Sequence, residues 1–391
     1  MNDDFGISDA ARDYSPLGLT ENPFPYSPVP ADEPEFYCGQ STATSAIGET
    51  ISAVLSTGKS KHMVLTGRYG NGKSHTLKYT RSLLTERADV LVGYVPQPGG
   101  GFLDIYHEFL YDLGFDRLRT MAYEYLADVA ELVEAEPAET PEQMQSHIDS
   151  GAVLLSEVVP PAIDRLSQLT RYPDFARALV HLLYDDTKLY AWQWLSGEGI
   201  RYEQRKQMEV HSALDDDTTA VRAFTALQRL LAALGYRGVF VFIDEFEGVA
   251  RQKPKDMQHT LNSIRHLMDQ NPTGLCLLFA CAPEVWQQIM AEYHAFGERI
   301  GEEVVIAPLT EEDMQQLLDA YLHRPATRER PLEIFESAAL QLLHQRSQGN
   351  ARQVISTCAR LLDYAIDAGR SHIDAETIER YYEDLMNKRS I

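Results

Sequence analysis

Five short apolar runs, separated by amphipathic stretches, indicate how this chain folds. The strongest run, 238–243, is continuous, as expected for a strand that is covered on both faces of a sheet. We expect strands at residues 62–65, 90–95, 238–243, 275–280 and 304–306. Helical spacing of apolar residues predicts helices at 46–56, at 75–86 and around 257–269. This alternation predicts an α/β protein, a parallel sheet flanked by helices.

The region from Leu103 to about Leu234 has helical patterns and no clear strand. It is long for one crossover connection between parallel strands, so we interpret it as a large helical insertion in the α/β core. Prolines predict breaks near residues 136–138, 159–161 and 171–173. We expect Trp192 and Trp194 to be aromatic anchors inside this insertion rather than side chains that stack on a base.

The two ends of the chain differ from the middle. Residues 1–45 are rich in Pro, Asp and Ser and predict an extended arm, in which Phe24 and Tyr26 pack either on the core or on a nucleotide base. From Thr310 onward the pattern is helical. We therefore expect an arm at 1–45, a core at 46–309 with its insertion at about 103–234, and a helical lid at 310–391.

Residues 67–74 match G-x-x-x-x-G-K-[ST], the phosphate loop of P-loop NTPases. An apolar strand precedes the motif and a helix follows it, which is the context that the motif requires. Lys73 is expected to reach the β- and γ-phosphates of ATP, and the Ser74 hydroxyl to bind Mg²⁺. We expect Arg68 and Tyr69 only to fill the loop. The expected nucleotide contacts are Gly67, Gly70, Asn71, Gly72, Lys73, Ser74 and His75.

Asp244 and Glu245 directly follow the strongest apolar run, which is the Walker B pattern. Ligands of open α/β sheets bind at the carboxyl ends of the strands, so Asp244 is expected to hold Mg²⁺, directly or through water. Glu245 would orient and deprotonate the water that attacks the γ-phosphate. Positive charge is also needed there, and Arg299 and Arg352 are candidates, although for any single arginine the sequence alone favours a surface ion pair.

Composition narrows the function classes. The formal net charge of −23 argues against a broad surface that coats nucleic acid, because phosphate binding needs clustered Lys and Arg. The acidic, polar N-terminus is unlike a signal peptide, and no apolar run is long enough for a membrane helix. The four cysteines form no C-x-x-C pair, and Cys276 and Cys281 are expected to be buried thiols. A cytoplasmic protein without a structural metal site is expected.

The order of these motifs resembles the AAA+ superfamily, within it the initiator clade of origin-recognition and Cdc-like ATPases. The resemblance spans residues 39 to about 365 and implies a P-loop NTPase (AAA+) core with a C-terminal helical lid. It implies that Arg299 is a finger reaching a neighbouring subunit's nucleotide, and that Arg352, in Gly349–Arg352, is the sensor 2 residue. It also implies ATP and Mg²⁺ as cofactors and a homo-oligomer formed through the ATPase core.

Residues 191–198, 226–238 and 244–247 additionally resemble the ATP-binding proteins of bacteriophage exclusion (BREX) systems. This resemblance implies antiviral defence with a helicase or nuclease partner, and DNA contact that is indirect or weak. The sequence departs from the AAA+ pattern at sensor 1, where Cys281 offers only a thiol. About eighty residues follow Thr310, enough for a lid but not for a winged-helix domain.

Three functions fit the sequence. The first is an ATPase that loads, remodels or licenses a nucleic-acid-processing partner. The second is a non-hydrolysing nucleotide switch, which the sensor 1 region favours and the intact pair Asp244 and Glu245 opposes. The third is a protein-sensing signalling ATPase without DNA contact, which the acidic charge favours.

Overall fold

The computed structural model describes residues 12–29, 31, 33–327, 329 and 331–389. The chain divides into two compact units, in which one contains the sheet and the other the C-terminal helices together with residues 67–79. Parts of the predicted arm and lid, residues 1–11, 30, 32, 328, 330 and 390–391, lie outside the described residues. Within the described ranges, no helix combines the length and apolarity needed to cross a membrane.

A five-stranded sheet in the order β2-β3-β4-β1-β5 confirms the predicted α/β class. The pairs β1–β4, β3–β4 and β2–β3 are all parallel. All five strands lie within two residues of their predicted bounds. They are β1 (Met63–Thr66), β2 (Val90–Val95), β3 (Gly238–Ile243), β4 (Leu275–Cys281) and β5 (Glu302–Val305).

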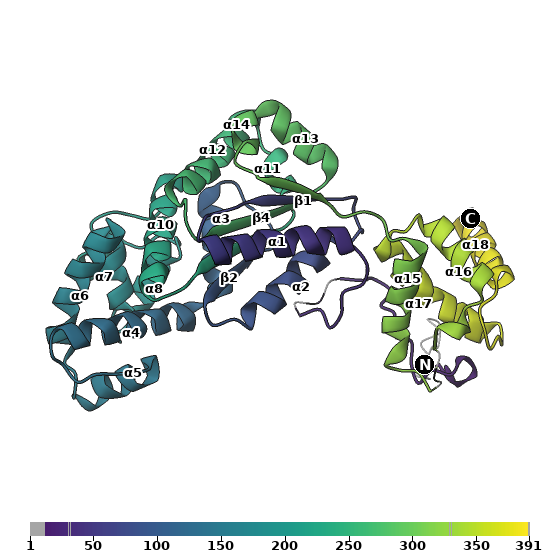
Figure 1. The fold of residues 1–391 in the computed structure, drawn as a ribbon, viewed down its shortest axis with the longest axis horizontal. Helices are drawn as coiled ribbons and strands as arrows, with labels where there is room; N and C mark the ends of the chain where they lie inside the picture. Colours follow the sequence, from purple (N-terminus) through teal and green to yellow (C-terminus); the bar gives the residue numbers. More distant parts are fainter. Residues whose placement is uncertain (1–11, 30, 32, 328, 330, 390–391) are drawn as a thin grey trace, which may run out of the picture. The chain divides into compact units, whose positions relative to one another are not determined.

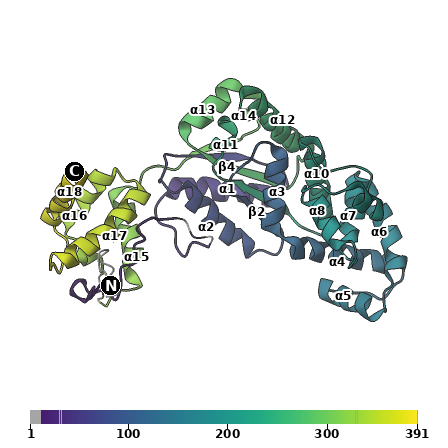
Figure 2. The same ribbon diagram turned by 180° about the vertical axis from the view of Figure 1, so that it is seen from behind.

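Helices cover both faces of this sheet (Figures 1 and 2). On β3, Val239, Val241 and Ile243 alternate with Phe240 and Phe242, and all five side chains are buried, which explains the continuous apolar run. The flanking helices are α1 (Ser41–Thr57), α2 (Lys73–Thr85), α3 (Phe102–Leu113), α10 (Asp217–Ala233), α11 (Glu247–Ala250), α12 (Pro254–Gln270), α13 (Pro283–Glu292) and α14 (His294–Gly297).

Helix α3 packs directly on β2 and is close enough to require a glycine. A Cβ at Gly93 would lie 2.3 Å from the Phe109 ring, so no larger residue fits without displacing that buried ring. Helix α10 contacts α3 and α12 on the same face. Both helices lie within the region 103–234 yet belong to the layer that covers the sheet.

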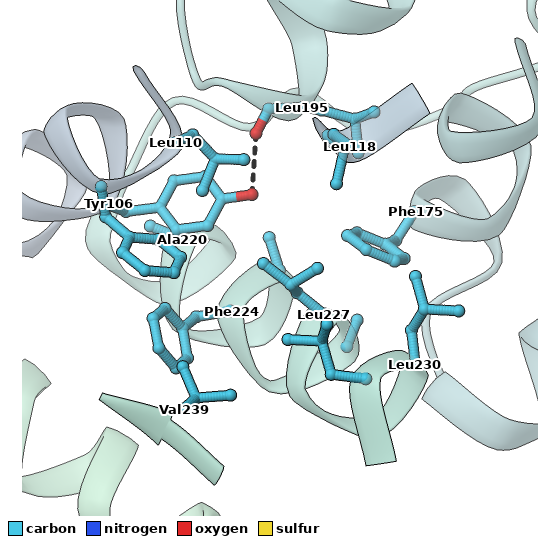
Figure 3. Close-up of a cluster of buried hydrophobic side chains, with 14 of the residues drawn as sticks. Tyr106, Leu110, Leu118, Phe175, Leu195, Ala220, Phe224, Leu227, Leu230 and Val239 are labelled. Carbon is cyan, nitrogen blue, oxygen red and sulfur yellow. Dashed lines mark hydrogen bonds between the residues drawn. The ribbon is translucent and has the colours of Figure 1, made fainter. Parts of the chain in front are cut away.

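The remaining helices of the insertion lie between α3 and α10 in the sequence, and Figure 1 shows α5, α6 and α7 on the far side of α10 from the sheet. They are α4 (Phe115–Leu132), α5 (Pro141–Ser150), α6 (Leu155–Thr170), α7 (Pro173–His181), α8 (Lys188–Leu195) and α9 (Tyr202–Gln207). One apolar core joins them to the sheet, and Figure 3 shows Leu118 and Phe175 on one side of Leu227 and Phe224 on the other, beside Val239. The insertion is therefore packed into the same core as the sheet.

Two expectations about the insertion have different outcomes. Trp194 is buried and donates its indole N–H to the Ser212 carbonyl at 2.9 Å, and Trp192 packs near Tyr111, so both are anchors as expected. The predicted break at residues 159–161 is wrong, because α6 runs through both prolines. Burial of Val158, Val159 and Ala162 in the core outweighs the backbone hydrogen bonds that prolines cannot donate.

The second unit has its own apolar core, built mainly from the C-terminal helices. Its elements are η1 (Ser15–Leu17), α15 (Glu311–His323), η2 (Pro331–Ile334), α16 (Ser337–Ser347), α17 (Ala351–Asp367) and α18 (Ala375–Arg389). Part of the N-terminal segment belongs to it, since Phe24 is buried with its ring 5.2 Å from Tyr321. Of the two alternatives for Phe24, core packing is therefore the correct one.

Candidate nucleotide site

The phosphate loop connects the end of β1 to the start of α2. Gly70 and Gly72 have φ angles of 85° and 103°, a conformation that side chains with a Cβ rarely adopt. At Gly67 a Cβ would lie 2.8 Å from the Ile306 carbonyl oxygen. These glycines let the backbone curl tightly, and the N–H groups at the start of α2 are the donors that phosphate-binding loops use.

Lys73 is the first residue of α2 and Ser74 the second. The Lys73 ammonium group donates to the Gly67 carbonyl at 2.8 Å, so this side chain folds back across the loop. The Thr76 N–H donates to the Gly72 carbonyl at 2.8 Å and continues the helix into the loop. The backbone of the loop thus holds the Lys73 ammonium group at the loop, where the motif predicts it.

The start of α17 contacts residues 69–71 of the phosphate loop. Asn350 caps α17 through its side-chain oxygen, which accepts from the Gln353 N–H. Its side-chain amide donates to the Tyr69 carbonyl at 2.7 Å and to Asn71 Oδ1 at 3.2 Å. The Arg352 N–H donates to the Gly70 carbonyl at 3.1 Å. Residues almost three hundred positions apart in the chain therefore fix the loop.

The Arg352 guanidinium lies over the Tyr69 ring, 4.7 Å from its centroid, and donates to the Pro28 carbonyl at 3.0 Å. The expectation that Tyr69 only fills the loop is wrong. An exposed tyrosine ring attracts a guanidinium through its π face, and only the fold brings these two residues together. Tyr69 and Pro28 thus set where the sensor 2 candidate points.

His75, an expected nucleotide contact, packs beside the N-terminal segment. Its Nε2 lies 2.9 Å from the Phe36 carbonyl, and its ring stacks on Tyr37 at 5.7 Å between centroids. Burial lowers the pKa of His75, while the hydrogen bond to Phe36 opposes that shift. The Tyr37 hydroxyl lies 2.9 Å from Thr76 Oγ1, so this segment braces the first turns of α2.

Asp244 emerges from the carboxyl end of β3, at the edge of the sheet where β1 also ends. It is 3% exposed. One carboxylate oxygen accepts from the Tyr94 hydroxyl at 2.7 Å, and the other from the Glu245 N–H at 2.9 Å. Sequence reasoning missed Tyr94, because nothing in strand 90–95 marks one aromatic residue as the partner of a carboxylate.

Glu245 is exposed and has a φ angle of 47°, in the left-handed region that glycine favours. Such backbone strain in a non-glycine residue is held by its surroundings and is concentrated at functional sites. The next residue, Phe246, is buried with its ring 4.7 Å from Phe279, and its N–H donates to the Ala280 carbonyl. This anchored phenylalanine holds the turn that projects Glu245.

Glu247 also fixes this turn and was missed from the sequence. One of its carboxylate oxygens accepts from the Ala282 N–H at 2.7 Å, which ties the turn after β3 to the end of β4. Cys281, at the predicted sensor 1 position, is the last residue of β4 and is buried in the core. Its thiol and that of Cys276 are both buried, as expected, and burial raises the pKa of Cys276.

Arg299 follows α14 and is exposed. Its Nε donates to Asp269 at 2.7 Å, and this contact raises the pKa of the guanidinium. The structure therefore places Arg299 in a surface ion pair with the end of α12. An exposed ion pair of this kind is weak, because solvent screens the two charges, so it leaves the guanidinium available to a competing anion.

The residues present suit a magnesium nucleotide. Mg²⁺ prefers oxygen ligands and is usually bound through one or two carboxylates together with substrate phosphates. In the sheet unit, Asp244 is a fixed, buried carboxylate of this kind, and the phosphate loop of the other unit is followed by the hydroxyl-bearing Ser74. Among the described residues, no group of three or more His, Cys, Asp or Glu side chains could hold a metal ion without such phosphates.

The comparison with protein families gives one match. The family described as BREX system ATP-binding protein BrxC/D matches residues 29–320, which include the phosphate loop, Asp244 and Arg299. A comparison with curated proteins found no match.

Several solved structures are similar at low sequence identity. The Aeropyrum pernix ORC1 protein in complex with DNA is 13% identical, with a TM-score of 0.44 over 90% of this chain and 66% of that chain. A Walker-type ATPase of Pyrococcus abyssi is 13% identical, with a TM-score of 0.44 over 93% and 78%. Cdc6p from Pyrobaculum aerophilum is 10% identical, with a TM-score of 0.41 over 87% and 66%. The chain thus spans just under two thirds of the ORC1 chain's length.

Proposed function

Since the chain belongs to the BREX system ATP-binding protein BrxC/D family, we propose that it hydrolyses ATP, oligomerises through its ATPase core and drives or licenses a nucleic-acid-processing partner in antiviral defence. The observation that carries the proposal is the phosphate loop at the start of α2 together with the fixed pair Asp244 and Glu245 after β3. In this proposal the phosphate loop binds the polyphosphate of ATP, Asp244 binds the metal ion, and Glu245 orients a water molecule.

Each residue has a role in this proposal. The loop amides, Lys73 and Ser74 bind the phosphates and the metal, and Asp244 holds the metal through one of its oxygens. Bound Mg²⁺ neutralises the charge on the phosphate oxygens. Glu245, exposed at the sheet edge, orients and deprotonates the attacking water. Arg352 contacts the nucleotide from the lid.

Arg299 is proposed to act on the nucleotide of a neighbouring subunit. Its weak ion pair with Asp269 is the contact that a neighbour's phosphate would replace. The helicase or nuclease partner and the cytoplasmic location belong to the same proposal. Contact with DNA is proposed to be indirect or weak, because the chain carries a formal charge of −23.

A second candidate is a non-hydrolysing switch, in which ATP binding orders an assembly interface. The burial of Cys281 favours it, because no polar side chain stands at that position to support the attacking water. The strained, exposed Glu245 favours hydrolysis.

ATP binding and turnover of the wild type, Lys73→Ala and Glu245→Gln separate the two candidates. Hydrolysis predicts loss of ATP binding in Lys73→Ala, and retained binding with turnover reduced at least about 100-fold in Glu245→Gln. Background turnover in the wild type, with normal ATP binding, supports the switch instead. Loss of ATP binding in Arg299→Ala would contradict the finger role.

A DNA titration across salt concentrations tests whether the protein contacts DNA directly. No affinity at low salt in the presence of ATP would exclude direct binding and favour a protein-sensing role. Steep loss of affinity with rising salt would instead indicate a phosphate contact.

A further inference from the structure

The Asp244 carboxylate is held by a tyrosine from the neighbouring strand. Tyr94 lies opposite Phe242 in the β2–β3 register and is 8% exposed. Its hydroxyl donates to Asp244 Oδ2 at 2.7 Å, while the Glu245 N–H donates to Oδ1. Each oxygen accepts one of these bonds, and a carboxylate oxygen has a second lone pair for a further ligand. The two donors therefore set the direction in which that second lone pair points.

Tyr94 is itself fixed by α2 and α3. Its backbone N–H donates to Asp112 Oδ2 at 2.8 Å, and Arg81 donates to Asp112 Oδ1 at 2.9 Å. The Arg81 guanidinium also lies over the Tyr94 ring, 5.8 Å from its centroid. Arg81 belongs to α2, the helix that begins at Lys73, so the far end of the phosphate-loop helix supports the tyrosine that holds Asp244.

We propose that Tyr94 is a positioning residue for the divalent cation: it fixes Asp244 in the rotamer that binds Mg²⁺, with Arg81 and Asp112 holding the tyrosine in place. This inference rests on the proposed ATP site. A buried carboxylate that loses one of its two donors is free to rotate, and its remaining lone pair no longer has a fixed direction. Partners of metal ligands outside the coordination sphere typically change metal affinity by about 10–100-fold when removed.

A structural tyrosine would behave differently, and the chain contains a matched control. Tyr106, in the same unit, is fully buried, and its hydroxyl donates to the Leu195 carbonyl at 2.7 Å, as Figure 3 shows. Tyr94→Phe and Tyr106→Phe each remove one hydroxyl that donates a hydrogen bond inside the protein. Both variants should lose comparable thermal stability, and only the first should change metal binding.

The experiment uses the full chain with a non-hydrolysable ATP analogue and follows Mn²⁺ binding by electron paramagnetic resonance. We expect Tyr94→Phe to weaken Mn²⁺ binding about tenfold, while Tyr106→Phe stays within about twofold of the wild type. Affinity for the analogue in excess chelator should be unchanged in both. Arg81→Gln, which keeps the hydroxyl and removes its support, should weaken Mn²⁺ binding by a smaller factor.

Wild-type Mn²⁺ affinity in folded Tyr94→Phe overturns the inference and leaves the ATP site standing. Equal losses of Mn²⁺ affinity in Tyr94→Phe and Tyr106→Phe also overturn it, since they indicate general destabilisation. If Tyr94→Phe does not fold, wild-type Mn²⁺ affinity in Arg81→Gln overturns it. A wild-type protein that binds neither the analogue nor Mn²⁺ overturns the proposed function itself.

Discussion

The phosphate loop and the turn that carries Asp244 and Glu245 are held in different ways. The loop is fixed by polar contacts from distant parts of the chain, such as Asn350 and the Ile306 carbonyl. The turn is fixed by a buried aromatic side chain, by its place at the end of a fully buried strand, and by the hydrogen bond between Glu247 and the Ala282 N–H. A loop held by hydrogen bonds can exchange partners when a ligand arrives, whereas a turn held by packing keeps its geometry.

The largest expected effect removes the packing that holds the turn. Phe246→Ala should lower the free energy of unfolding of the sheet unit by about 3–5 kcal/mol, because it empties a site between Phe279 and Phe296. Tyr69→Ala, in the phosphate loop, should cost less than about 1 kcal/mol, because that ring is exposed. Urea unfolding measures both, and equal losses would contradict the distinction.

Acid should destabilise the sheet through His62. Burial lowers the pKa of His62 from 6.5 to about 4, and its Nδ1 accepts from the Leu277 N–H, which keeps the ring neutral. The unfolded chain takes up the proton first as pH falls. Stability is therefore full above about pH 6.5 and is lost toward pH 4, by about 3 kcal/mol in total.

His62→Gln should flatten this pH dependence, since glutamine offers an acceptor to Leu277 and does not titrate. The pKa of His75 beside the phosphate loop is also lowered, but its bond to the Phe36 carbonyl opposes the shift. His75→Gln should therefore change the pH profile less. A profile unaltered in His62→Gln would remove His62 as the cause.

Asn350→Ala tests the polar attachment of the loop. It removes a helix cap and two hydrogen bonds to the loop, so we expect a stability loss of about 1 kcal/mol and about tenfold weaker ATP binding. Thr140→Ala removes a similar cap, at the start of α5, and should cost similar stability with no change in ATP affinity. Calorimetric titration of both variants with ATP gives the comparison. Unchanged affinity in Asn350→Ala would mean that the lid contact does not shape the loop.

The smallest effect concerns the strain at Glu245. Glu245→Gly should be more stable than Glu245→Ala by about 1 kcal/mol, because glycine adopts the left-handed conformation freely. At Gln316, an exposed position inside α15, the order should reverse, with alanine the more stable residue. Thermal unfolding of the four variants decides this, and the same order at both positions would argue against strain.

Local patterns predicted the strands and the order of the motifs. The run 238–243 is continuous because both faces of β3 are buried, and the acidic pair follows directly at the carboxyl end of that strand. The prolines of α6 led to the wrong prediction of a helix break at 159–161, because the burial of their neighbours depends on tertiary contacts that the local sequence does not reveal. Tyr69, Tyr94 and Glu247 could not be found, since their partners are set by the register of strands and by contacts between distant segments.

The roles proposed for Lys73, Asp244, Arg299 and Arg352 stay predictions until the variants are measured. The motif accepts any residue at position 69, whereas the cation–π contact with Arg352 gives Tyr69 a structural role. The signal for Asn350 was partly readable, because Gly-Asn before an amphipathic run marks a helix start. Its second role, as a donor to the phosphate loop, depended on a partner 279 residues away in the sequence.

Because α17 is hydrogen-bonded to the phosphate loop, nucleotide binding at the loop and ligand binding at α17 are expected to be energetically coupled. If ATP shifts the loop backbone at Tyr69 or Gly70, the bonds to Asn350 and Arg352 must strengthen or weaken with it. Coupling free energy has no preferred direction. A molecule that binds α17 would therefore change the ATP affinity by the same factor by which ATP changes the affinity for that molecule. A titration in either order would measure this factor.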